Sequence, residues 1–181
     1  MAKYLTDVVA YFQNLCVQHP LLKHGEESGR RVFEVIAYDE ALGDFKTGAK
    51  EKGYFVRFIL PTMKWTNNGN NAFKRYECGI MVGKHYSTRE DAKTEKVAAW
   101  SAAERVADDL IARMVYDSRD GHALFNSTID LVENTNLSGD FLDAQGDGSY
   151  AAVMYLFDFG TFRCIDATGS DFVSAGWLDL Q

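Results

Sequence analysis

One short stretch of the sequence has nearly the residue spacing of a phosphate-binding loop. Residues 79–84, Gly-Ile-Met-Val-Gly-Lys, follow a predicted strand and precede a predicted helix, as such a loop does. However, three residues separate the glycines where the loop needs four, and His85 stands where Ser or Thr would bind magnesium. Because this backbone would not enclose a phosphate in the usual way, we do not predict nucleotide binding.

A second stretch, residues 143–148, begins like a calcium-binding loop. Its third position is Gln145 rather than Asp or Asn, and Met154 occupies the twelfth position, where a bidentate Glu is needed. The loop therefore lacks its strongest ligand. We predict an acidic turn exposed to solvent.

The histidines and cysteines lack the spacing of a metal site or a nucleophilic site. No HExxH or HxxxH pattern links the four histidines, His19, His24, His85 and His122, and no CxxC pattern links the three cysteines, Cys16, Cys78 and Cys164. Cys78 and His85 could form a nucleophile and its base. However, Cys78 is predicted to face the core, where a thiol is unreactive. We predict no catalytic, metal-binding or cofactor-binding residue, and a protein that is not an enzyme.

The composition is that of an ordinary globular domain. The chain has 181 residues, of which 46% are hydrophobic and 25% charged, and its net charge is −7. Lys and Arg are not clustered, which disfavours nucleic acid as a partner. No apolar run approaches the ~20 residues of a membrane span, and residues 1–20 have the pattern of an amphipathic helix rather than a signal peptide. We expect a soluble cytoplasmic protein without a membrane partner.

The N-terminal part of the chain predicts a helix followed by a strand. Residues 3–19 carry an apolar stripe of Tyr4, Leu5, Val8, Phe12, Leu15 and Cys16 at helical spacing. Pro20 ends this helix because proline cannot donate the next backbone hydrogen bond. Residues 31–38 are rich in β-branched and aromatic types and predict a strand. Residues 39–53 are predicted to form a surface loop.

A long β-hairpin is the clearest element in the chain. Residues 54–66 and 72–82 flank an Asn/Gly-rich tip at 67–71. Folding about Gly69 predicts five pairs: Trp65–Phe73, Thr62–Tyr76, Leu60–Cys78, Phe58–Ile80 and Val56–Val82. One face is then almost wholly apolar and is the predicted core, formed by Tyr54, Val56, Phe58, Leu60, Tyr76, Cys78, Ile80 and Val82. The opposite face comprises Phe55, Arg57, Ile59, Met63, Trp65, Phe73, Arg75, Glu77 and Met81.

Four residues toward the hairpin tip form a candidate protein interface: Met63, Trp65, Phe73 and Arg75. Aromatic, Met and Arg side chains are the types that interface cores favour. The alternative is that another segment of the same chain covers them, such as the C-terminal tail with Trp177. The sequence leaves both possibilities open.

The second half of the chain predicts one long helix and further strands. Ser87 and Glu90 have capping-box spacing, and a helix is expected from there to residue 117 or 118, with Ala99, Ala103, Val106, Leu110 and Met114 in one stripe. A helix of this length spans about 45 Å, so its polar first turns should project, pack on a neighbour or be broken. Strands are predicted at 128–133, 150–159 and 161–165, with an acidic loop at 134–149.

These elements predict one α+β domain at 1–165, followed by a tail at 166–181. Its mostly antiparallel sheet has a long projecting hairpin and packs against an N-terminal helix and a long central helix. The element order over residues 3–159 resembles that of phage tail-completion proteins of the tail-terminator type. That resemblance implies a non-enzymatic assembly subunit that forms a homo-oligomeric ring, typically a hexamer, binds other assembly proteins, and occurs in the host cytoplasm and the virion. It rests on topology, so it assigns no site residue.

Two other functions stay open. The protein could be a small ligand-binding or enzymatic domain with a pocket under the sheet. That pocket would be lined by Tyr76, Tyr150 or Tyr155, with polar groups from His85 or Arg57. It could instead be a monomeric adaptor that binds one partner through the hairpin tip.

Overall fold

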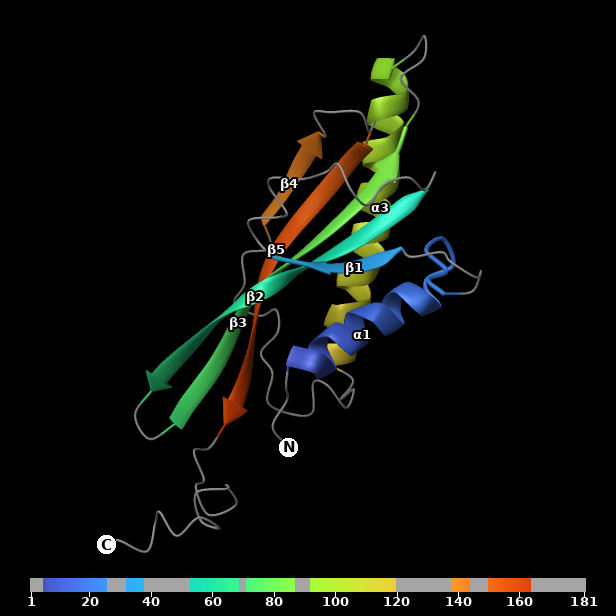
Figure 1. The fold of residues 1–181 in the computed structure, drawn as a ribbon. Helices are drawn as coiled ribbons and strands as arrows, with labels where there is room; N and C mark the ends of the chain where they lie inside the picture. Colours follow the sequence, from blue (N-terminus) through green and yellow to red (C-terminus); the bar gives the residue numbers. More distant parts are fainter. Residues whose placement is uncertain are drawn as a thin grey trace, which may run out of the picture.

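The protein has two helices and a five-stranded mixed sheet in the described part of the chain (Figure 1). The computed structural model describes residues 5–25, 32–37, 53–68, 71–86, 92–119, 138–143 and 150–163. Its elements are α1 (Leu5–Gln18), β1 (Phe33–Ile36), β2 (Tyr54–Asn68), β3 (Asn71–His85), α3 (Ala92–Arg119), β4 (Ser138–Asp143) and β5 (Tyr150–Arg163). The strand order is β1-β2-β3-β5-β4, and β1 with β2 is the parallel pair. The predicted α+β class is confirmed.

The predicted stripe of α1 lies in the core. Val8, Phe12, Leu15 and Cys16 are buried, and the ring of Phe12 stacks on Phe58 with 4.7 Å between ring centroids. Two details differ from the prediction, because Leu5 is exposed and Tyr11, outside the stripe, is buried. Tyr11 is accommodated because its hydroxyl has a hydrogen-bond partner on α3.

The long helix α3 follows its predicted stripe. Ala99, Ala103, Val106, Leu110 and Met114 are all buried. Its first turns are exposed and extend past the end of the sheet in Figure 1. Of the three predicted outcomes for these turns, this is projection. The predicted capping box at Ser87 lies outside the described residues.

The hairpin register is correct for half its length and then shifts by one residue. The pairs Val56–Val82 and Phe58–Ile80 form as predicted, but Thr62 pairs with Glu77. Between them, Leu60 and Pro61 stand opposite a single residue of β3, which is a β-bulge. Proline has no N–H for the strand ladder and is tolerated in a sheet at such irregularities.

The bulge makes two of the predicted pairings wrong, Thr62–Tyr76 and Trp65–Phe73, and leaves Leu60 sharing the position opposite Cys78 with Pro61. Leu60 is also 38% exposed instead of belonging to the core. The rest of the predicted core face holds where the structure describes its side chains, since Val56, Phe58, Cys78, Ile80 and Val82 are buried and Tyr54 packs against them.

The face predicted to be outward is buried around its centre. Ile59 and Met81 pack with Ile36, Ala152 and Met154 in a second apolar cluster. Arg57, also predicted to face outward, is 5% exposed. The prediction named one core face, whereas both faces of the central sheet carry a buried apolar cluster.

Strand β5 lies between β3 and β4. Its sequence is apolar on both faces because Val153 and Phe157 pack in the helix-side core, whereas Ala152 and Met154 pack in the second cluster. The strand runs without a break to Arg163. Residues 161–163 therefore belong to β5 and do not begin the separate strand that was predicted at 161–165. Strand β4 lies within the predicted acidic loop 134–149, which is therefore also wrong over 138–143. The strand predicted at 128–133, most of the candidate calcium loop, and the tail at 166–181 lie outside the described residues.

The sequence Ser-Gly-Asp-Phe-Leu-Asp of β4 has low strand propensity, so contacts with other elements have to supply its stability. It pairs with β5 from Ser138 to Asp143, and the Trp100 indole N–H donates to the carbonyl oxygen of Leu142 at 2.9 Å. The ring of Phe141 meets Trp100 edge to face at 6.0 Å. Sequence propensity does not detect a strand held in this way.

Candidate functional site

Three strands form an arm at one end of the sheet. We define the arm as residues 62–68 of β2, 71–77 of β3 and 158–163 of β5, which are paired with one another. In Figure 1 it extends beyond both α1 and α3. The predicted hairpin is therefore not isolated, since β5 adds a third strand along β3.

The four predicted interface residues, Met63, Trp65, Phe73 and Arg75, all belong to the arm. Their strand positions are described, whereas their side chains lie outside the described part of the structure. Met63 pairs with Tyr76 and Trp65 with Lys74, while Phe73 pairs with Thr66. The bulge at Pro61 thus removes the predicted Trp65–Phe73 pair. It also corrects the prediction that the four residues share one face: by register, positions 63 and 65 lie on the opposite face of the arm from positions 73 and 75.

The charge of the arm differs in sign from that of the whole chain. The arm contains four basic residues and two acidic ones, a net charge of +2, whereas the whole chain carries −7. The basic residues are Lys64, Lys74, Arg75 and Arg163, and the acidic ones are Glu77 and Asp158. The remainder of the chain therefore has a net charge of −9.

The face of the sheet opposite the described helices carries a cluster around Arg57. Its guanidinium Nε lies 3.3 Å from Glu34 Oε2, and its Cζ lies 5.3 Å from the centroid of the Phe55 ring. The Tyr150 ring meets Phe55 at 5.6 Å and His85 at 5.2 Å, both edge to face. Burial raises the pKa of the Tyr150 hydroxyl, and the charge of Arg57 acts in the opposite direction.

Two glycines of β3 are required by this packing. A Cβ on Gly83 would overlap the ring of Phe55, and one on Gly79 would lie 2.8 Å from Ile59 Cδ1. Both glycines lie inside a strand that is paired on its two sides. The phosphate-loop-like stretch 79–84 is therefore a strand segment whose glycines make room for neighbouring side chains.

The residues predicted to line a pocket do not all share one face. Tyr150, His85 and Arg57 belong to the cluster just described, but Tyr155 lies on the helix side. Its hydroxyl donates to Asp108 Oδ1 at 2.7 Å, and burial together with this hydrogen bond raises the pKa of Tyr155 to about 12. The side chain of Tyr76 lies outside the described residues. Of the three tyrosines proposed as pocket-lining residues, Tyr150 therefore lies with His85 and Arg57, whereas Tyr155 does not.

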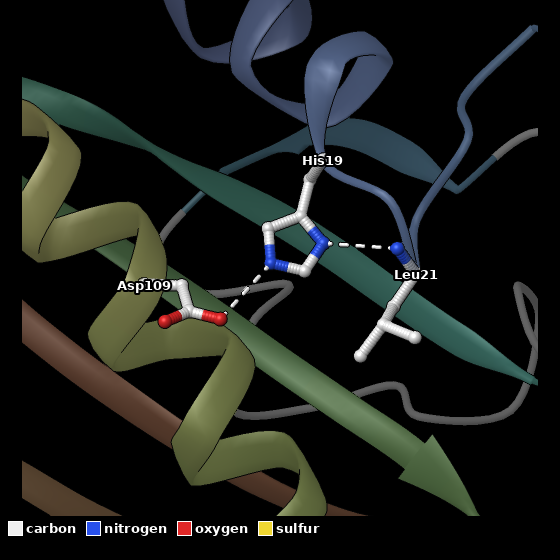
Figure 2. A network of polar contacts seen from close by, with 3 residues as sticks. All are labelled: His19, Leu21 and Asp109. Atoms are coloured by element: carbon white, nitrogen blue, oxygen red, sulfur yellow. Dashed lines mark hydrogen bonds and ion pairs between the residues drawn. The ribbon is translucent and has the colours of Figure 1, made fainter.

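Two histidines form hydrogen bonds with neighbouring segments just after the end of α1. Figure 2 shows His19 between Leu21 and Asp109: the Leu21 N–H donates to Nδ1 at 3.2 Å, and Nε2 lies 3.4 Å from Asp109 Oδ2. Nε2 therefore carries the ring proton and donates to the carboxylate. His24 accepts hydrogen bonds from the backbone N–H groups of Val32 and Phe33 at its Nδ1. Sequence spacing did not indicate either role, because the partners are backbone groups and a distant helix.

The two described cysteines lie in the core and are not in disulfides. Burial raises the pKa of the Cys16 thiol to about 12, which leaves it almost entirely protonated at neutral pH. Cys78 packs on the helix side of β3, whereas His85, seven residues further along the strand, contacts Tyr150 on the other side. The Cys78–His85 arrangement considered for catalysis is not formed.

No protein-family model matches the chain, and no curated protein is similar enough to count as a relative. Among the described residues, no group of three or more His, Cys, Asp or Glu side chains is arranged to hold a metal ion. In the same part of the chain, neither helix combines the length and apolar character needed to cross a membrane.

Proposed function

We propose that this protein is a structural subunit of a larger assembly and that it contacts neighbouring copies through the arm. The observation that carries the proposal is the extension of three paired strands beyond both described helices (Figure 1). A small sheet needs an apolar layer against at least one face to be stable in water. In an oligomer, a neighbouring subunit supplies that layer.

The residue types of the arm support this proposal. Its large apolar and aromatic residues are Met63, Trp65, Phe73, Tyr76, Phe159 and Phe162. Aromatic side chains and Met are enriched in the cores of protein interfaces relative to other surface. The candidate interface thus includes residues of β5 that the sequence prediction did not consider.

The charges favour a contact between unlike surfaces. A basic arm on one copy is attracted to the acidic remainder of another, which gives a head-to-tail contact rather than one between identical patches. Head-to-tail contacts generate a ring when the rotation closes. Such a contact weakens when salt screens the charges.

A ring of this kind fits a phage tail-completion protein of the tail-terminator type, and we propose that this protein is such a ring subunit. The support is the order of helix, strand, hairpin, long helix and further strands. On this proposal the protein is a non-enzymatic ring subunit, typically of a hexamer. It binds other assembly proteins and occurs in the host cytoplasm and the virion.

The test is the absolute mass of the purified protein, measured by light scattering over a concentration series. We expect a discrete ring-sized species at low salt and its partial dissociation at about 0.5 M salt, where the Debye length is only a few ångströms. The double variant Trp65→Asp/Phe73→Asp should be monomeric. Tyr116→Asp changes an aromatic residue on α3 that is 56% exposed and outside the arm, so it should assemble normally.

A wild-type protein that stays monomeric at every concentration would contradict self-assembly and favour the adaptor function. A ring that survives in the arm variant would contradict the role of the arm. Assembly lost equally in Tyr116→Asp would mean that the added charge, and not its position, disrupts the oligomer.

A further inference from the structure

The imidazole of His24 closes the connection between α1 and β1. Its Nδ1 lies 3.2 Å from the backbone nitrogens of both Val32 and Phe33, and the ring of Phe33 packs against it edge to face at 6.2 Å. The backbone N–H of His24 donates to the carbonyl oxygen of Cys16 at 3.3 Å. One residue thus ties the end of the N-terminal helix to the first residues of the sheet.

The backbone around His24 is held in an unusual conformation. Lys23, directly before it, has φ 47°, and Gly25, directly after it, has φ 79°. A left-handed conformation at a residue with a side chain is energetically unfavourable and persists only where surrounding contacts enforce it. The turn therefore places the His24 ring against the start of β1 despite a local energetic cost.

An imidazole nitrogen accepts hydrogen bonds only while it carries no proton. The geometry therefore assigns His24 the neutral form with its proton on Nε2. We propose that His24 is an acid-sensitive latch: a proton on Nδ1 removes the acceptor for Val32 and Phe33 and releases the start of β1 from the helix layer.

The described charged groups near the latch do not offset this loss. Lys23 precedes His24, Glu34 on β1 is paired with Arg57 on β2, and Asp109 on α3 faces His19. Among the described residues, no carboxylate pairs with the His24 ring. His19 differs, because a proton on its ring creates an ion pair with Asp109 while it breaks one hydrogen bond to Leu21.

Release of β1 would change the edge of the sheet. β1 has four residues and is the outermost described strand on its side, and Val32 next to it accepts a 2.7 Å hydrogen bond from the Val56 N–H. Loss of these contacts exposes the edge of the neighbouring strand β2. The inference is independent of the proposed assembly, which depends on the other end of the sheet.

The test compares wild type with His24→Asn by amide hydrogen exchange at about pH 7.5 and about pH 5, which span the range in which imidazole ordinarily gains its charge. The Asn Oδ1 atom can take the place of Nδ1 as an acceptor, and it does not titrate. Protection factors at Val32 and Phe33 should fall roughly tenfold at the lower pH in wild type, as expected for the loss of one or two hydrogen bonds. They should change less than about twofold in the variant.

Two further measurements make the result decisive. Nitrogen NMR of the wild-type ring at neutral pH should identify the Nε2–H form; the Nδ1–H form would overturn the proposal. His19→Asn should leave the acid response at Val32 and Phe33 unchanged. The proposal also fails if wild type shows no acid response, or if His24→Asn responds as strongly as wild type.

Discussion

The hydroxyl of Tyr11 on α1 donates a 2.8 Å hydrogen bond to Asp117 Oδ2 on α3, and both residues are almost completely buried. The other carboxylate oxygen of Asp117 lies 2.9 Å from Nε of Arg113, one helical turn earlier. This group joins the two helices at a point where an unpaired carboxylate would be costly to bury. It is the main buried polar contact between α1 and α3 in the described part of the chain.

Tyr11→Phe should therefore destabilise the protein by about 1–3 kcal/mol, because Asp117 loses a buried hydrogen-bond donor. The matched control is Tyr155→Phe, whose hydroxyl bonds to the exposed Asp108 and should cost less than about 1 kcal/mol. Urea denaturation followed by circular dichroism measures both. Equal losses would mean that the Tyr11 hydrogen bond gains nothing from its burial.

The same contact predicts lower stability in alkali. Burial, followed by the hydrogen bond to Asp117, raises the pKa of Tyr11 above its usual value near 10. The folded state keeps the phenol proton while the unfolded chain loses it, so the free energy of unfolding should fall as pH rises above about 10. Tyr11→Phe lacks this contribution, and its stability deficit relative to wild type should narrow between about pH 9 and pH 11. A constant deficit over that range would contradict the assignment.

Gly83→Ala should cost about 1–3 kcal/mol, the usual penalty for inserting a methyl group into a well-packed site. The added Cβ overlaps the ring of Phe55, which cannot move without disturbing its contact with Tyr150. In the background of Phe55→Leu the same substitution should cost clearly less. A double-mutant cycle on unfolding free energies tests this, and additive costs would exclude steric coupling between the two positions.

Cys16 should resist alkylation in the folded protein at neutral pH. Its thiol is buried and its pKa is raised to about 12, so both the thiolate fraction and access of the reagent are low. Mass spectrometry after brief iodoacetamide treatment should find Cys16 unmodified in native protein and modified in urea. Rapid native labelling would indicate that α1 opens readily from the sheet.

Elements with an uninterrupted apolar period were predictable from the sequence. The buried stripes of α1 and α3 repeat at helical spacing, and the apolar run of β5 follows from the burial of both its faces. Strand β4 was missed because its Gly and Asp residues carry turn signals, which are overridden by pairing with β5 and by the contacts with Trp100. Pro61 was a local signal for the bulge and would have corrected the hairpin register.

The candidate site was predictable only in outline. The sequence located Trp65 and Phe73 toward the hairpin tip, but it did not predict that β5 continues alongside them to form a third strand. The roles of Tyr11 and His24 depend on partners that are distant in sequence or belong to the backbone. Such contacts arise from tertiary packing and leave no periodic pattern.

The arm has no chain break or linker at its base, because β2, β3 and β5 each run from the helix-covered part of the sheet into it. A pull along the strands at the far end is therefore transmitted by three continuous backbones into the helix-covered part of the sheet. The architecture thus suits the arm to carry mechanical tension into the body of the protein.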